Sequence, residues 1–263
     1  MTNSRPPILT ALVWTYLDVY HVLRTAWRSG LVALTIVIAG AFALVGGPLL
    51  VTYDPVGQAI MRLFIMVGLC ALLTPFLLAQ LRLTLLGEPP PLYAFEPRNP
   101  RFQLFFGWLA VSAVILSAPS FLLVLMTPNG PEYYSGAGPI DAPTPLLIHA
   151  TRLAAWMLIM RLGILLPAVA IDAPGATWQN AFDDSRRHGW YIPVVTFVAL
   201  IPFGLLGAAA PSLRSLGGPL LLRAFVDVGL RAAGFLLLVV IPMLIAARLY
   251  QAVGAKLNEP SHV

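Results

Sequence analysis

Charged residues are scarce in this sequence of 263 residues, of which only 10% are Asp, Glu, Lys or Arg. Soluble domains carry about 25% charged residues, and these cover the surface that faces water. The chain has 16 basic and 11 acidic side chains, too few to cover one or two soluble domains of this length. Because 59% of the residues are hydrophobic and the mean hydropathy is +0.83, we expect a protein embedded in lipid.

Residues and motifs that carry common enzyme chemistry are also missing. Cys70 is the only cysteine, which excludes an intrachain disulfide and a cysteine-based metal site. The histidines are far apart in sequence, and there is no P-loop, H-E-x-x-H motif or G-x-S-x-G elbow. We therefore predict no catalytic residue, no bound metal and no cofactor. The sequence favours a non-enzymatic protein and leaves an intramembrane enzyme as the third alternative.

The excess of basic residues gives a net charge of +5, which raises the question of nucleic-acid binding. Nucleic-acid-binding surfaces need clustered basic residues, often with aromatic residues between them. Here the basic residues are scattered between hydrophobic runs, where the preference for positive charge on the cytoplasmic side of a membrane accounts for them. We expect membrane lipids as partners and no nucleic acid.

Long uncharged runs dominate what the sequence does contain. A helix needs about 20 apolar residues to cross a bilayer core, and six runs come close to that length. They cover residues 31–52, 60–86, 102–126, 146–171, 190–210 and 227–250. We predict an all-α, polytopic bundle of about six transmembrane helices, forming a single membrane domain over residues 1–263. Each run contains a proline, which predicts kinks, although proline is common in membrane helices.

Two shorter segments have the pattern of helices that lie in the membrane interface. In residues 8–28, apolar residues recur every three or four positions, while the charged residues lie off that stripe. The stripe consists of Leu9, Val13, Tyr16, Tyr20, Leu23 and Trp27, and the polar positions are Asp18, His21, Arg24 and Arg28. Residues 172–190 repeat this pattern on a smaller scale, with Trp178 and Phe182 on one face.

The positions of arginine residues suggest three repeated helical hairpins. Basic residues precede the first, third and fifth runs, and an Arg-Leu pair lies late in each of the others, at Arg82, Arg161 and Arg248. Chance alignment in an arginine-rich chain is the alternative explanation. Counting Lys and Arg on either side predicts that both termini are cytoplasmic, in a bacterial inner membrane. Residues 127–145 then form an outer loop, irregular because of its proline and glycine.

Charges inside or near a membrane span are the default candidates for a functional role. The candidate functional or anchoring residues are Arg161, Arg82, Arg248, Arg152, Asp227 and Arg231. Arg161 lies deepest in an uncharged run. It either reaches the lipid headgroups as an anchor or binds carbonyls or an anionic ligand. The repeat favours the anchor. Asp227 and Arg231 are one helical turn apart, so they can neutralise each other without a ligand.

One stretch of the sequence resembles a known family. Its residues are Arg161, Leu166-Pro167-Ala168, Asp172, Gly175, Trp178, Phe182, Ser185 and Gly189-Trp190. Here the chain resembles bacterial six-helix membrane proteins related to the membrane domain of glycerophosphoryl diester phosphodiesterases. The resemblance implies an all-helical membrane domain of hairpins with interfacial helices. The catalytic barrel of such enzymes has no counterpart here, so we do not expect their activity.

These observations favour a non-enzymatic scaffold, assembly subunit or accessory subunit of a membrane complex, with a membrane protein partner or a second copy of the chain. Small residues such as Gly40, Gly46 and Gly47 would permit close helix approach. The alternative is a small-molecule or lipid transporter or channel, which the kinked runs and Arg161 favour. A polar cavity that reaches Arg161 would favour transport.

Overall fold

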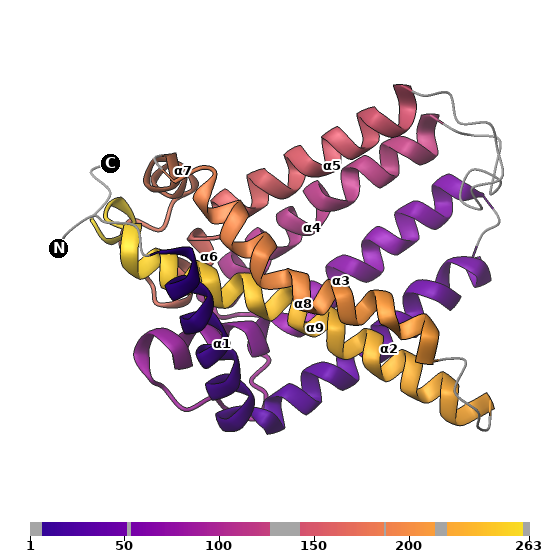
Figure 1. The fold of residues 1–263 in the computed structure, drawn as a ribbon, viewed down its shortest axis with the longest axis horizontal. Helices are drawn as coiled ribbons and strands as arrows, with labels where there is room; N and C mark the ends of the chain where they lie inside the picture. Colours follow the sequence, from indigo (N-terminus) through magenta and orange to yellow (C-terminus); the bar gives the residue numbers. More distant parts are fainter. Residues whose placement is uncertain (1–6, 52–53, 127–142, 187, 214–219, 260–263) are drawn as a thin grey trace.

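The computed structural model describes residues 7–51, 54–126, 143–186, 188–213 and 220–259, and all of the regular structure in them is helical. The α-helices are α1 (Ile8–Thr25), α2 (Trp27–Val51), α3 (Pro55–Leu86), α4 (Pro100–Met126), α5 (Pro143–Leu162), α6 (Leu165–Ala170), α7 (Trp178–Arg186), α8 (Tyr191–Leu213) and α9 (Leu220–Val253). A short 3₁₀ helix, η2 (Lys256–Asn258), follows α9 (Figure 1). The predicted all-α fold is confirmed.

Within the described residues, five stretches are long and apolar enough to cross a membrane, and four of them contain an internal proline. They are Trp27–Leu44, Pro55–Leu86, Pro100–Leu122, Leu146–Ala170 and Val228–Val253. The fifth predicted run, residues 190–210, corresponds to α8, of which the stretch Tyr191–Phe203 is apolar but shorter than the other five. The protein is therefore a multi-pass membrane protein with helices at all six predicted runs. The predicted outer loop falls largely on residues 127–142, outside the described residues.

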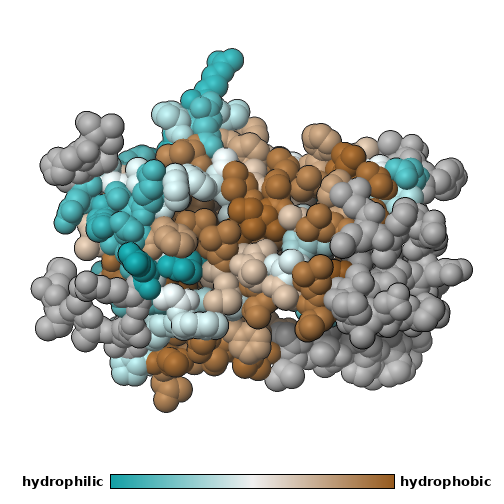
Figure 2. Space-filling view, turned by 90° about the horizontal axis from the view of Figure 1, so that it is seen from above, coloured by the Kyte–Doolittle hydropathy of each residue, from teal (hydrophilic) through white to brown (hydrophobic). Residues whose placement is uncertain are grey.

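The long helices form hairpins that share one end of the bundle. Helix α2 packs on α3, α4 on α5, and α8 on α9. Helices α1, α6 and α7 and the C-terminal end of α9 lie at one end of the molecule, and the pairs α4–α5 and α8–α9 diverge from it (Figure 1). Hydrophilic residues gather toward the same end, while the middle of the molecule is mostly hydrophobic (Figure 2). We call the end that holds α1, α6 and α7 the charged end.

The fourth predicted span, residues 146–171, is divided into two helices in a run whose proline predicted a kink. Helix α5 ends at Leu162, and α6 begins at Leu165. Pro167 lacks a backbone N–H, and its ring would clash with the carbonyl of Gly163 in a continuous helix. That carbonyl instead accepts a hydrogen bond from the N–H of Leu166 at 3.2 Å, so the break follows from the proline.

Helix α1 turns Asp18 toward the bundle, whereas the other predicted polar positions, His21, Arg24 and Arg28, are exposed. Thr15, Asp18 and Val22 are buried against the bundle, and α1 contacts α8 and α9. The predicted stripe is exposed instead, with Leu9 76% and Tyr20 63% exposed. An exposed apolar stripe of this kind is what an interfacial helix presents to lipid.

Candidate functional site

Three arginines at the charged end each contact the segment that precedes a hairpin. We call Arg82, Arg161 and Arg248 the repeat arginines, since they are the Arg-Leu arginines of the sequence. They lie near the ends of α3, α5 and α9, the second helices of the three hairpins. Their partners lie on the segment before α4, on α7 before α8, and on α1 before α2.

Arg82 forms a bidentate ion pair with Glu88, just beyond the end of α3. Its Nε and Nη2 groups donate to the two Glu88 carboxylate oxygens at 2.6 and 2.7 Å. Its Nη1 group donates to the Ala170 carbonyl at the end of α6, at 3.0 Å. One guanidinium thus holds the end of α3 to the residues that follow it and joins the first hairpin to the end of the second, and the pair lowers the pKa of the Glu88 carboxyl.

Arg248 holds α9 to α1 across most of the length of the chain. Its Nε and Nη2 groups donate to the Asp18 carboxylate at 2.7 and 2.6 Å. The Asp18 side chain is 11% exposed and that of Arg248 is 38% exposed, so the pair is partly withdrawn from water. This contact joins the third hairpin to the helix that leads into the first.

Arg161 differs from the other two because its partner is an aromatic ring. Its Cζ atom lies 4.2 Å from the centroid of the Phe182 ring on α7, in cation–π geometry. Within the described part of the chain, Arg161 contacts no carboxylate, and its buried Nε group has no hydrogen-bond partner. A side chain at Gly189 would lie 3.7 Å from Cζ, so the chain passes close to the guanidinium here.

The three contacts together connect the hairpins in a ring. The first hairpin contacts Ala170 at the end of the second, the second contacts α7 before the third, and the third contacts α1 before the first. The predicted repeat places these arginines at equivalent positions, and it stays a prediction. Most of the charge at this end therefore ties helices to one another.

A fourth contact closes the second hairpin at its own base. Arg101, at the start of α4, donates from Nε to an Asp172 oxygen at 2.8 Å, and its Nη2 group contacts the other oxygen. Asp172 has a φ of +55°, a backbone conformation that Asp and Asn adopt more readily than most residues. The Arg101 guanidinium lowers the pKa of the Asp172 carboxyl.

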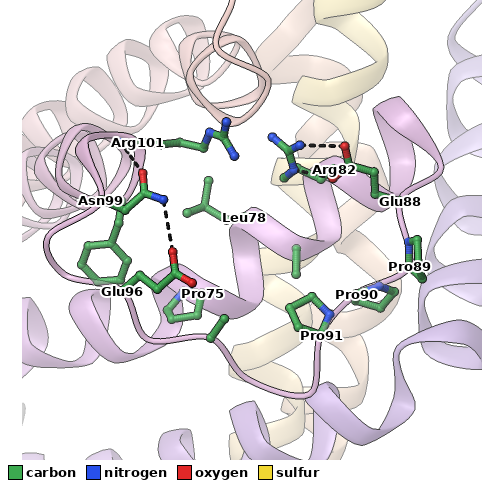
Figure 3. A pocket seen from close by; sticks show the side chains of 13 residues that line it. Pro75, Leu78, Arg82, Glu88, Pro89, Pro90, Pro91, Glu96, Asn99 and Arg101 are labelled. Atoms are coloured by element: carbon green, nitrogen blue, oxygen red, sulfur yellow. Dashed lines mark hydrogen bonds and ion pairs between the residues drawn. The ribbon is translucent and has the colours of Figure 1, made fainter.

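The cavity nearest these charges lies beneath the loop that joins α3 to α4. It has a volume of about 260 Å³ and is lined by Arg82, Arg101 and Glu96, together with three consecutive prolines (Figure 3). The arginines lie on one side of it and Pro89, Pro90 and Pro91 on another. Both arginines already have carboxylate partners, and Glu96 accepts from Asn99 at 3.2 Å. Both arginines of the cavity are therefore paired, whereas Glu96 keeps its negative charge beside a neutral amide.

The segment after α9 folds back onto α7 and the turn before it. Lys256 forms an ion pair with Asp183 at 2.7 Å, and Asp184 accepts from the backbone N–H groups of Lys256 and Leu257. Gly175 donates its N–H to the Leu257 carbonyl at 3.0 Å. A Cβ atom at Gly175 would lie 2.3 Å from the Lys256 carbonyl oxygen, so only glycine fits this approach.

A larger cavity, of about 380 Å³, lies between α3, α4, α5–α6, α8 and α9 and is almost entirely apolar. The hydroxyls of Ser112, Ser117 and Thr196 line it, and each donates to a carbonyl four residues earlier in its own helix. Arg161 is not among the lining residues, although its neighbours Met160 and Gly163 are. The polar cavity reaching Arg161 that would favour transport is not found in the described residues.

The remaining candidate residues are not brought to a common site. Arg152 is exposed on α5, where its Nη2 group lies 3.4 Å from the Ser120 hydroxyl. Arg231 is exposed on α9, and the side chain of Asp227 lies outside the described residues, so their ion pair stays a prediction. Among the described residues, no group of three or more His, Cys, Asp or Glu side chains is placed to hold a metal ion.

Several residues at the charged end were not candidates in the sequence. Glu88, Asp183 and Asp184 follow the hydrophobic runs as ordinary surface acids, and their spacing gives no signal of partners. Comparison with protein-family models, curated proteins and solved structures finds no match for this chain. The resemblance to the phosphodiesterase membrane domain therefore stays a prediction. Several residues that carry it have structural roles, since Leu166 and Ser185 are buried and Phe182 contacts Arg161.

The Arg101–Asp172 contact predicts a defined pH dependence. Because the folded-state pKa of Asp172 lies below its ordinary value of 3.8, the contact stabilises the protein above that value and is lost as the pH falls through the lowered pKa. Asp172→Asn keeps the backbone conformation but removes the charge. We expect it to be less stable than the parent protein at about pH 7, and we expect a smaller difference at a pH below 3.8. Equal differences at both pH values in a detergent unfolding titration would contradict this role.

Proposed function

We propose that the protein is a non-enzymatic membrane scaffold that serves as an assembly or accessory subunit of a membrane complex. This proposal rests on how the charged side chains at the charged end pair with one another. Arg82, Arg101, Arg248 and Lys256 each pair with a carboxylate from another segment or element. Side chains that could do chemistry thus hold the helices together, and the two arginines that line the 260 Å³ cavity are already paired with carboxylates.

The proposal includes an orientation in a bacterial inner membrane, with the charged end and both termini on the cytoplasmic side. The repeat arginines Arg82 and Arg248 lie there together with Arg101 and Lys256. Positive residues are retained on the cytoplasmic side of membrane proteins, which supports this orientation.

A shallow groove between α2 and α3 supplies a surface for a partner. Thr35, Ala39 and Ala43 are exposed at four-residue intervals on α2, and they line this groove with the exposed Gly68 of α3. Small residues allow two helix backbones to approach closely in a membrane. Gly40 has a different role, because a Cβ there would lie 2.3 Å from Leu69, so it serves the packing of α2 on α3. We propose that a partner's transmembrane helix occupies the groove.

Site-specific photo-crosslinking tests this function. A photoreactive residue at Ala39 should give one protein adduct of defined mass in native membranes. The same residue at Phe197, which is 61% exposed on α8, should give lipid adducts only. Ala43→Leu should fill the groove and reduce the Ala39 adduct. Adducts to lipid alone at both positions would contradict the scaffold function.

A second function, the transport of a lipid or apolar molecule, is favoured by one observation. The break between α5 and α6 borders the 380 Å³ cavity through Gly163, and Pro242 of α9 lines its wall. Broken helices often form the substrate path of transporters. Transport of a fluorescent lipid across vesicles that contain the purified protein, exceeding that of empty vesicles, would support this function over the scaffold.

A further inference from the structure

We propose that Arg161 and the apolar cavity beside it form a binding site for one anionic phospholipid. The Arg161 guanidinium binds the phosphodiester group, and an acyl chain lies in the cavity. The site is independent of the scaffold function, because neither the Arg161 guanidinium nor the cavity is part of the α2–α3 groove.

The charge of Arg161 requires a partner that the described chain does not supply. A guanidinium keeps its proton under all ordinary conditions, so its charge must be solvated or paired. Arg82 and Arg248, at equivalent places in their hairpins, have bidentate carboxylate partners. Arg161 has only the Phe182 ring, which covers one face of the guanidinium and donates no negative charge. An external anion would give all three repeat arginines an anionic partner.

The fork of Arg161 is placed to receive that anion. Its Nε atom is enclosed, whereas its two terminal nitrogens are not enclosed and make no hydrogen bond within the described chain. A planar fork of two N–H donors matches two oxygens of a phosphate group. The ring of Phe182 restricts the guanidinium to one plane, which reduces the entropy that binding would cost.

The turn that the Arg161 guanidinium contacts leads into α8, which lines the cavity. Gly189, against which the Arg161 guanidinium lies, is three residues before Ile192 and seven before Thr196. The N–H of Ile192 donates to the His188 carbonyl, so the helical spacing extends back to this turn and the three residues share one face. Ile192 and Thr196 line the apolar cavity. A positively charged guanidinium near an apolar cavity fits a phospholipid, which has both a phosphate group and acyl chains, and does not fit a free phosphate ion.

Lipid titration of the purified full-length protein in detergent tests the site. The probes are phosphatidylglycerol, phosphatidylcholine and inorganic phosphate, and bound lipid is counted by native mass spectrometry alongside the shift in melting temperature. We expect one phosphatidylglycerol per chain, bound more tightly than phosphatidylcholine, and no melting shift with inorganic phosphate. Stabilisation by inorganic phosphate equal to that by phosphatidylglycerol would overturn the lipid assignment.

Two matched pairs of variants distinguish the contribution of the Arg161 guanidinium to lipid binding from that of the cavity. Arg161→Gln should weaken phosphatidylglycerol binding about tenfold or more, and Arg161→Lys nearly as much, because lysine lacks the fork. Arg152→Gln, on the same helix, should leave binding unchanged. Ser117→Phe, which fills the cavity, should weaken binding, whereas Val114→Phe, on the exposed face of α4, should not.

The variants also distinguish binding from anchoring. If Arg161 only anchors the helix at the headgroups, lysine should restore full binding and stability, because lysine reaches the same depth. Full recovery by Arg161→Lys would therefore overturn the proposal, and so would unchanged binding in Ser117→Phe. Should Arg161→Gln fail to fold, the lysine and phenylalanine variants still decide the outcome.

Discussion

Asp18→Ala should destabilise the protein by about 2–3 kcal/mol, because it leaves the Arg248 guanidinium partly buried without its bidentate partner. The Asp18 carboxylate is 11% exposed and receives two hydrogen bonds from Arg248, at 2.7 and 2.6 Å. Loss of the pair should also release α1 from α9. Unfolding in mixed detergent micelles measures the free energy, and hydrogen exchange of residues 8–25 reports the release.

The exposed ion pair between Asp183 and Lys256 is the matched control. Its side chains are 49% and 53% exposed, so Asp183→Ala should cost less than about 1 kcal/mol. Combining Asp18→Ala with Arg248→Met should restore part of the lost stability, since no unpaired charge remains. Equal effects of Asp18→Ala and Asp183→Ala would show that the Asp18–Arg248 contact does not join the hairpins.

Gly175→Ala should separate the C-terminal segment from α7 and cost about 3 kcal/mol. A Cβ at this position would lie 2.3, 2.6 and 2.9 Å from the carbonyl oxygens of Lys256, Glu259 and Leu257. These atoms belong to the backbone, so they cannot move aside as a flexible side chain can. Hydrogen exchange of residues 254–259 should rise strongly in the variant.

Gly107→Ala provides the control, because no atom lies within 4 Å of a Cβ at that position on α4. Alanine is favoured over glycine in a helix, so this variant should be as stable as the parent protein or slightly more stable. If Gly175→Ala and Gly107→Ala behaved alike, the close approach of the C-terminal segment would be wrong.

The sequence predicted the helices well because their main signal is local. Each long apolar run corresponds to a helix, and the arginines singled out by the Arg-Leu pattern all lie near one end of the bundle. The break in the fourth span was harder to place. Pro167 predicted a kink, but the position of the break at Gly163 depends on a carbonyl four residues earlier.

The sequence failed where a polar residue meets a partner from a distant segment. Asp18 lies off the apolar stripe of α1, a pattern that indicates a solvated face in a soluble protein. In lipid the apolar stripe faces outward, so Asp18 turns toward the bundle and pairs with Arg248. The contacts of Gly175 and Asp184 with residues 256–259 depend on two distant segments meeting, which no local pattern indicates.

Cysteine accessibility tests most directly whether the charged end, where the hairpins are joined, faces the cytoplasm. Single cysteines at Glu259, at the charged end, and at Ser135, in the predicted outer loop, would be introduced into a Cys70→Ser protein in intact cells. A membrane-impermeant maleimide should label position 135 and should label position 259 only after the cells are opened. Labelling of both positions in intact cells, or of position 259 alone, would contradict the account.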